Sequence, residues 1–137
     1  MEVCMKITTT MVCWLIAVLT AGSLNAGTWS DYKIISEQDD VVISYRERPA
    51  DNGWFAEWKV ENNGRDWVEP FVKQRTYMCA DGKQNNFVNK SLGPYPAGEE
   101  RRGGIRDNGV CRDSQIKSVR TDIEMRPVSE KIRKMWE

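Results

Sequence analysis

The sequence predicts an all-β fold, a small antiparallel sandwich of about seven or eight strands, and three observations lead to it. Short segments with apolar residues at alternate positions follow one another, with turn-forming residues between them at the spacing of about 8–12 residues that is typical of sandwiches. Residues 54–61 place two tryptophans and a valine on one parity of a strand. Cys79 and Cys111 are available to form a disulfide. A small β-barrel is the alternative arrangement of the same strands.

Residues 1–26 are predicted to be a cleavable signal peptide. The apolar run 11–19 has the length of a signal hydrophobic region and is too short to span a bilayer. Small and polar residues follow it, and cleavage is expected after Ala26, with Ser23 as the alternative position. An uncleaved N-terminal anchor is the competing interpretation. Residues 27–137 then form a single domain in the periplasm or outside the cell, with no further segment of membrane-spanning length.

The cysteines support this interpretation. Cys4 and Cys13 lie within the predicted signal peptide, so the mature chain retains Cys79 and Cys111. An even pair in an exported domain predicts a structural disulfide. Their spacing is far from that of a redox Cys-x-x-Cys pair, and the sequence has no histidine to complete a zinc site. Closing this loop is expected to stabilise the fold by roughly 3.5–4 kcal/mol in the chain-entropy model.

The first three strands are expected at residues 29–36, 41–48 and 54–61. The polar residues 38–40 form the first turn, and the composition of residues 49–53 is typical of a loop. One parity of the second and third strands carries the residues that we assign to the core: Ile43, Tyr45, Trp58 and Val60.

The opposite parity of the third strand is charged and is expected to face solvent. Glycoside hydrolysis requires only two carboxylates, and Glu57 and Glu61 share this face. Lys59 lies between them, which favours an ordinary row of cross-strand ion pairs over a catalytic pair. Asn63-Gly64 then tolerate positive φ and allow the chain to reverse.

Four more strands are expected in the second half of the chain, at residues 71–79, 84–92, 99–105 and 116–125. Pro70 is expected to break the chain before the first of these. Lys73 and Arg75 interrupt its apolar parity, which predicts a bulge or a change of sheet. Residues 80–83 form a hairpin turn, and the strand that follows is polar, as is typical of an edge strand. Residues 93–98 contain two prolines and two glycines and are expected to be irregular.

The chain is expected to end in a short helix. The strand at residues 99–105 should stop at Asp107-Asn108-Gly109, and Pro127 should end the last strand. In the tail, residues 126–137, Ser129 is a candidate N-cap. Three apolar residues have helical spacing at i, i+3 and i+4: Ile132, Met135 and Trp136.

Residues 54–63, 77–82 and 92–98 resemble, in style, small extracytoplasmic immunoglobulin-like modules. In such modules a tryptophan-bearing strand ends in Asn-Asn-Gly, a cysteine follows, and a Leu…Pro-x-Gly turn comes later. The resemblance implies an immunoglobulin-like sandwich. The cysteine placement differs from the antibody pattern, because no cysteine of the mature chain precedes the core tryptophan.

The composition excludes most catalytic chemistry, and we predict a protein that is not an enzyme, with no catalytic residue, metal or cofactor. The lack of histidine removes Ser-His-Asp and Cys-His catalysis. Residues 102–106 are glycine-rich but too short and basic to bind a nucleotide. Turn formation already explains the acidic residues at 39–40 and 51–53, which lack a complete calcium loop. Basic residues predominate after residue 100, but acidic residues interleave with them, so no nucleic-acid partner is expected.

Recognition by surface aromatic residues fits the composition better. The mature chain has more tryptophans than one small core requires, and two of them lie next to polar loops. Tyr95 lies between Pro94 and Pro96, which restrict its backbone. The candidate binding surface therefore consists of Trp54, Trp67 and Tyr95.

The leading functional hypothesis is a non-catalytic exported module that binds another protein of the envelope or a secreted protein. The alternative is a carbohydrate-binding module that uses exposed Trp and Tyr residues on a polysaccharide. A third hypothesis comes from Tyr77-Met78-Cys79-Ala80-Asp81-Gly82, which resembles the Tyr-x-Cys-x-x-Gly stretch of periplasmic lysozyme inhibitors of the small β-barrel type. That resemblance implies a C-type lysozyme as the partner.

Overall fold

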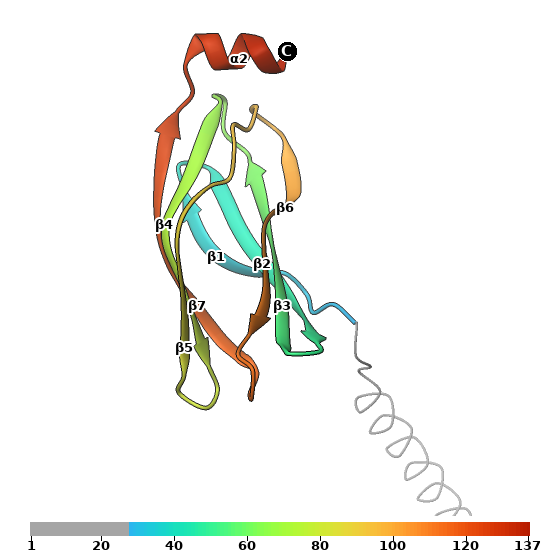
Figure 1. Cartoon of the computed structure of the whole chain (residues 1–137). Helices are drawn as coiled ribbons and strands as arrows, with labels where there is room; N and C mark the ends of the chain where they lie inside the picture. The colour runs from blue at the N-terminus through green and yellow to red at the C-terminus, as the bar shows by residue number, and fades with distance from the viewer. Residues whose placement is uncertain (1–27) are drawn as a thin grey trace, which may run out of the picture.

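The structure is a computed structural model that describes residues 28–137, and this part of the chain forms two antiparallel sheets packed face to face (Figure 1). Its strands are β1 (Lys33–Gln38), β2 (Val41–Ala50), β3 (Gly53–Asn62), β4 (Val68–Cys79), β5 (Gln84–Ser91), β6 (Glu100–Val110) and β7 (Ile116–Pro127). The predicted helix α2 (Glu130–Trp136) follows, and the Ser129 hydroxyl caps it by accepting a hydrogen bond from the N–H of Ile132. The predicted signal peptide, residues 1–26, lies outside the described residues.

The strand order is β1-β2-β3-β6 in the four-stranded sheet and β5-β4-β7 in the three-stranded sheet. The polar strand β5 therefore lies at an edge, as its sequence predicts. Four and three strands are also the numbers found in a constant-type immunoglobulin sandwich. Here, however, β1, β2 and β3 are consecutive neighbours, so the connections differ from that fold. The predicted antiparallel sandwich is confirmed, and the two sheets do not close into a barrel.

Two prolines lie inside strands, where the sequence predicted a loop and a break. The backbone of Glu47 in β2 forms hydrogen bonds with Ser30. The nitrogen of Pro49, two residues later in β2, faces the same edge of the strand. The described pairing on that side ends at Ser30, so the missing N–H of Pro49 interrupts no ladder bond. The carbonyl of Pro70 in β4 accepts a hydrogen bond from the N–H of Leu92, just beyond the end of β5. Pro70 therefore lies at the very end of the ladder between β4 and β5, where its missing N–H removes at most one terminal hydrogen bond.

The β2–β3 hairpin and the end of β6 also differ from the prediction. A two-residue turn, Asp51-Asn52, joins β2 to β3 and is shorter than the expected loop. Strand β6 does not stop at residues 107–109 but continues to Val110, because its register shifts against β3 and Gly109 supplies a positive φ of 72°. A Cβ at Gly53 would lie 2.7 Å from the carbonyl oxygen of Val110. The hairpin can approach β6 this closely only with glycine at that position.

The core lies between the two sheets. The four residues that the sequence assigns to it are at most 3% exposed: Ile43, Tyr45, Trp58 and Val60. They pack with residues of the opposite sheet such as Val72 and Tyr77. The predicted disulfide Cys79–Cys111 connects the end of β4 to the residue after β6, and so joins one sheet to the other. Within residues 28–137, no helix is long and apolar enough to cross a membrane.

A chain of polar contacts crosses the core, and we call its four members the inter-sheet network: Trp58, Arg75, Tyr77 and Asp107. The indole N–H of Trp58 donates to the Tyr77 hydroxyl (2.9 Å), which donates to Oδ2 of Asp107 (2.5 Å). Arg75 binds both oxygens of the same carboxylate at 2.7 Å through its Nε and Nη2. Arg75 and Asp107 are 7% and 6% exposed, so this bidentate pair is largely desolvated.

A bulge in β4 directs Arg75 into the core. The register of β4 against β7 shifts between Val72 and Gln74. Val72 and Arg75 are both buried, whereas Lys73 and Gln74 between them are exposed. The irregularity predicted from the interrupted apolar parity is therefore present, and it places a cation beside Asp107 of the opposite sheet.

The buried tyrosines predict a loss of stability in alkali. Burial, together with the negative charge of Glu47, raises the pKa of Tyr45 to about 12. Burial and the neighbouring Asp107 carboxylate also raise the pKa of Tyr77. An unfolded tyrosine ionises near pH 10, so above that pH the folded state retains protons that the unfolded state loses. Stability should therefore fall as the pH rises through about 10 to 12.

Denaturant unfolding at a series of pH values from neutral to strongly alkaline measures this effect. Because Tyr45→Phe removes one of the groups, its unfolding midpoint should fall less steeply with pH than that of the wild type. Identical pH profiles for the two proteins would contradict the assignment to Tyr45.

Candidate binding face on the four-stranded sheet

The outer face of the four-stranded sheet combines cationic side chains with aromatic rings. We call this set of eight residues the cation–aromatic face: Arg46, Arg48, Lys59, Arg102, Arg106, Trp29, Tyr32 and Phe55. The strand register explains how they come together, because Arg48 is paired with Phe55 and Lys59 with Arg102. Directly paired residues project to the same side of a sheet, so neighbouring strands contribute to one surface.

Two of the aromatic rings come from the segment that precedes β1. The N–H of Ser30 donates to the carbonyl of Glu47 (2.8 Å), and the Ser30 hydroxyl accepts a hydrogen bond from the N–H of Glu47 (3.0 Å). The segment is thus held along β2, although the strand itself begins later than predicted, at Lys33. Trp29 and Tyr32 are thereby brought over the side chains of β2 and β3.

Cationic groups lie close to the rings of this face. The guanidinium carbon of Arg46 lies 4.2 Å from the ring centre of Trp29, and Nζ of Lys59 lies 4.2 Å from that of Tyr32. Such cation–π contacts contribute about 0.5–1 kcal/mol at exposed sites and more when desolvated. They also restrict the rotamers of long side chains, so part of the entropy cost of binding an anion is met before the ligand arrives.

A single carboxylate, Glu57, lies at the centre of the arginines. It is 5% exposed, and it forms ion pairs with Arg46 (2.7 Å) and Arg106 (3.5 Å). The prediction that this parity of β3 faces solvent is therefore wrong for Glu57, because the segment around Tyr32 covers it. The hydroxyl of Tyr32 lies 3.5 Å from the same carboxylate. Cross-strand ion pairing was expected on this face, and the pair of Arg46 and Glu57 is one.

The positive charge of the face is concentrated toward the β2–β3 hairpin. Lys59 is paired with Glu61 (2.9 Å), and Arg102 lies 3.8 Å from Glu100, so acidic residues balance that half of the face. At the hairpin half, Glu57 is the only carboxylate of residues 28–137 that forms an ion pair with an arginine of the face, and it pairs with Arg46 and Arg106. Arg48 is the member of the face that has no carboxylate within ion-pair distance among residues 28–137.

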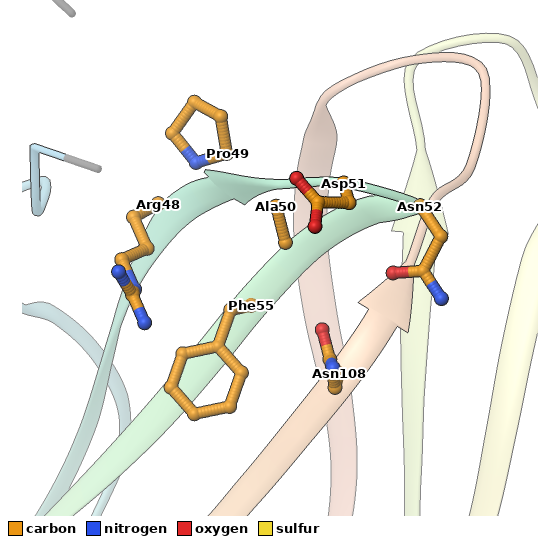
Figure 2. A pocket seen from close by; sticks show the side chains of 7 residues that line it. All are labelled: Arg48, Pro49, Ala50, Asp51, Asn52, Phe55 and Asn108. Atoms are coloured by element: carbon orange, nitrogen blue, oxygen red, sulfur yellow. The ribbon is translucent and has the colours of Figure 1, made fainter. Parts of the chain in front are cut away.

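A surface hollow adjoins Arg48 at the hairpin end of the face (Figure 2). Its lining residues come from the β2–β3 hairpin and from β6: Arg48, Pro49, Ala50, Asp51, Asn52, Phe55 and Asn108. Figure 2 shows the side chains of Arg48 and Phe55 on one side of the view, with those of Asn52 and Asn108 on the other. The hollow thus offers a cation, an aromatic ring, two amides and one carboxylate.

The three residues predicted as the binding surface do not lie together. Trp54 is half-buried, packs against the core and borders a hollow near the β2–β3 hairpin. Trp67 borders a different hollow beside the β1–β2 turn, at the other end of β3 and about 30 Å away by strand length. Tyr95 is 1% exposed, which corrects its assignment to the surface. Its N–H and carbonyl both pair with the backbone of Val68, and its side chain packs in the core.

The candidate carboxylates are also dispersed. Asp39-Asp40 and Asp51 lie in the turns at opposite ends of β2. Among residues 28–137, no three His, Cys, Asp or Glu side chains are grouped so that they could hold a metal ion. Glu57 is occupied by two arginines, and Glu61 by Lys59. Glu57 and Glu61 are therefore both engaged in ion pairs.

The hairpin that resembles the lysozyme inhibitors has mainly structural residues. Tyr77 belongs to the inter-sheet network and Cys79 to the disulfide, and both are buried. The turn after them is fixed by Asp81, whose carboxylate accepts a hydrogen bond from the N–H of Lys83 (3.0 Å). The residues that carry this resemblance are therefore explained by the fold.

The cation–aromatic face leaves no signal in any single strand of the sequence. Arg46 and Arg48 occupy the outward parity of β2, and Phe55 and Lys59 that of β3, so the pattern emerges only once the two strands are paired. Recognition of the two-residue turn at Asp51-Asn52 would have fixed that register. No protein-family model matches the chain, and searches among curated proteins and solved structures likewise find no significant match.

Proposed function

We propose that this chain is an exported, non-catalytic module that binds an acidic protein through its cation–aromatic face. The observation that carries the proposal is the group of three arginines at the hairpin end, Arg46, Arg48 and Arg106. Among residues 28–137 Glu57 is the one carboxylate in ion-pair contact with any of them, and the ring of Trp29 holds two of the guanidinium groups. Arginine and aromatic residues are enriched at the energetic centres of protein interfaces. The disulfide and the predicted signal peptide support export.

A protein partner fits this face better than a glycan or a nucleic acid. Sugars and bases bind to aromatic side chains by stacking on exposed ring faces. Here Arg46 and Arg48 lie against Trp29, and Lys59 lies against Tyr32, so the cations already occupy these rings. What the face presents is a set of oriented positive charges, which complement acidic side chains.

Charge reversal at the exposed edge of the face tests the proposal. Arg102→Glu/Arg106→Glu should weaken binding of a glutamate-rich peptide by at least about tenfold at low salt, and wild-type binding should weaken as salt rises. Fluorescence anisotropy of the labelled peptide measures both effects, with a glutamine-rich peptide of equal length as the uncharged reference. Both positions are exposed, and the buried Glu57, which loses its ion pair with Arg106, keeps the shorter one with Arg46.

The matched control is Lys117→Glu/Arg120→Glu, which makes the same charge change at exposed positions of β7 in the other sheet. It should leave peptide binding nearly unchanged. Equal losses in the two double variants would mean that net charge alone drives binding, and the proposal would be wrong. A second experiment uses the natural partner. A protein that the wild type captures from envelope extracts should also bind it directly once purified, whereas Arg102→Glu/Arg106→Glu should not bind that protein.

Carbohydrate binding and lysozyme inhibition remain predictions. Tryptophan fluorescence titrated with a glycan panel tests the first, with Trp54 and Trp67 as the residues to replace. An inhibition assay with a C-type lysozyme tests the second.

A further inference from the structure

Arg48 differs from the other cations of the face in how it is held. Its guanidinium carbon lies 5.0 Å from the ring centre of Trp29 and 5.2 Å from that of Phe55. These two rings are 5.5 Å apart, so the three groups form a compact triangle. A guanidinium in such a triangle is fixed in position without being neutralised.

The polar groups of Arg48 are incompletely satisfied. Its Nε is buried and has no hydrogen-bond partner among the described residues. Arg46 and Arg106 share Glu57, and Arg102 lies beside Glu100, but no described carboxylate lies within 4.0 Å of Arg48. A buried donor without a partner carries a free-energy cost that a ligand with an acceptor group can remove.

The hollow beside Arg48 contains further groups that are free to bind. The side-chain amides of Asn52 and Asn108 form no hydrogen bond with any described residue, and neither does the carboxylate of Asp51. All three residues are exposed at the rim. The set therefore offers donors for a carboxylate, an acceptor for an N–H group, and the ring of Phe55 for methylene groups.

We infer that this hollow is a specificity site for an acidic side chain of the protein partner. The carboxylate of that side chain binds Arg48, and its methylene stem packs on Phe55. A peptide N–H lies next to every such side chain and is suited to Asp51, whereas a bare inorganic anion would be repelled there. The inference rests on the proposed function and adds to it the site that selects the acidic residue.

NMR titration of the disulfide-bonded protein tests the site with three small probes. These are N-acetyl-glutamate N-methylamide, the matching glutamine compound and inorganic phosphate. We expect the glutamate probe to shift the side-chain amide signals of Asn52 and Asn108 and the Nε–H signal of Arg48. The glutamine probe should bind at least about tenfold more weakly, because it lacks the charge that a guanidinium recognises.

Arg48→Met keeps an unbranched stem that can still pack on Trp29 and Phe55, and it should abolish the response to the glutamate probe. Arg48→Lys restores the charge without the planar fork and should recover only part of the affinity. Arg65→Met is the matched control, because Arg65 is exposed in the hollow at the opposite end of the sandwich and also has no described ion pair. It should bind like the wild type.

Equal binding of the glutamate and glutamine probes would overturn the inference. A preference for phosphate, or equal losses in Arg48→Met and Arg65→Met, would do the same. If the hollow gives no response while the glutamate-rich peptide still depends on Arg102 and Arg106, the inference fails and the proposed function stands. If the peptide shows no dependence on those arginines, the proposed function fails, whatever the hollow binds.

Discussion

Replacement of Asp107 by alanine is expected to lower the free energy of unfolding by about 3–5 kcal/mol, a large part of the stability of a domain of this size. Asp107 is the common acceptor of the inter-sheet network, binding Arg75 through two hydrogen bonds and Tyr77 through a third. Its removal leaves the Arg75 guanidinium buried without a counter-charge. The Tyr77 hydroxyl also loses its acceptor, although it still accepts a hydrogen bond from Trp58.

Denaturant unfolding of the purified variant measures the loss. Glu124→Ala is a matched control, because it removes ion pairs with Lys73 and Arg126 in which all three side chains are about half exposed. That change should cost no more than about 1 kcal/mol. The double variant Arg75→Met/Asp107→Leu removes both charges and should recover much of the stability lost in Asp107→Ala. An Asp107→Ala protein as stable as the Glu124→Ala protein would show that the network contributes little.

The strands could be predicted where apolar residues alternate along one segment. That local signal locates β2 and β3 and assigns Tyr45 and Trp58 to the core, where both are found. The local signal fails at Pro49 and Pro70, because a proline is excluded from a strand only where its missing N–H would interrupt a ladder, and not at the end of one. Whether a partner is present depends on where β1 and β5 end, which is a property of the whole sheet.

The inter-sheet network illustrates a second limit. Arg75 interrupts the apolar parity of β4, and Asp107 lies in a stretch that is typical of a turn. Neither residue alone indicates a buried ion pair, and they are 32 residues apart in the chain. Only the bulge in β4 and the continuation of β6 bring them together. Local patterns predict that such irregularities exist, but they do not predict which distant residue is brought into contact as a result.

The candidate site could not be predicted for a related reason. The surplus of tryptophans pointed to aromatic residues at the surface, but Trp29 and Phe55, and not Trp67 or Tyr95, lie with the arginines of the cation–aromatic face. The position of Trp29 depends on hydrogen bonds between Ser30 and β2. Such a contact covers one face of a sheet without leaving a periodic signal in the sequence.

Removal of the disulfide is expected to have the second large effect, on stability and on the binding hollow together. Cys79→Ser/Cys111→Ser should lower the free energy of unfolding by about 2–5 kcal/mol, mainly because the unfolded chain loses a loop constraint. Wild-type protein unfolded in the presence of a reductant should show a similar loss. Denaturant unfolding with and without reductant measures both, and the double variant should not respond to the reductant. A double variant as stable as the oxidised wild type would contradict this expectation.

The effect on the hollow follows from where the disulfide lies. Cys111 comes directly after Val110, whose carbonyl oxygen the β2–β3 hairpin approaches so closely that only glycine fits at residue 53. Without the covalent bond, the N–H of Cys111 is still held by the side chain of Asn85 at 2.9 Å, which is a much weaker constraint. The end of β6, including Asn108, should then move more freely against the hairpin. Under conditions where the double variant remains folded, the glutamate probe should therefore bind it more weakly than the wild type, whereas unchanged affinity would mean that the hairpin alone shapes the hollow.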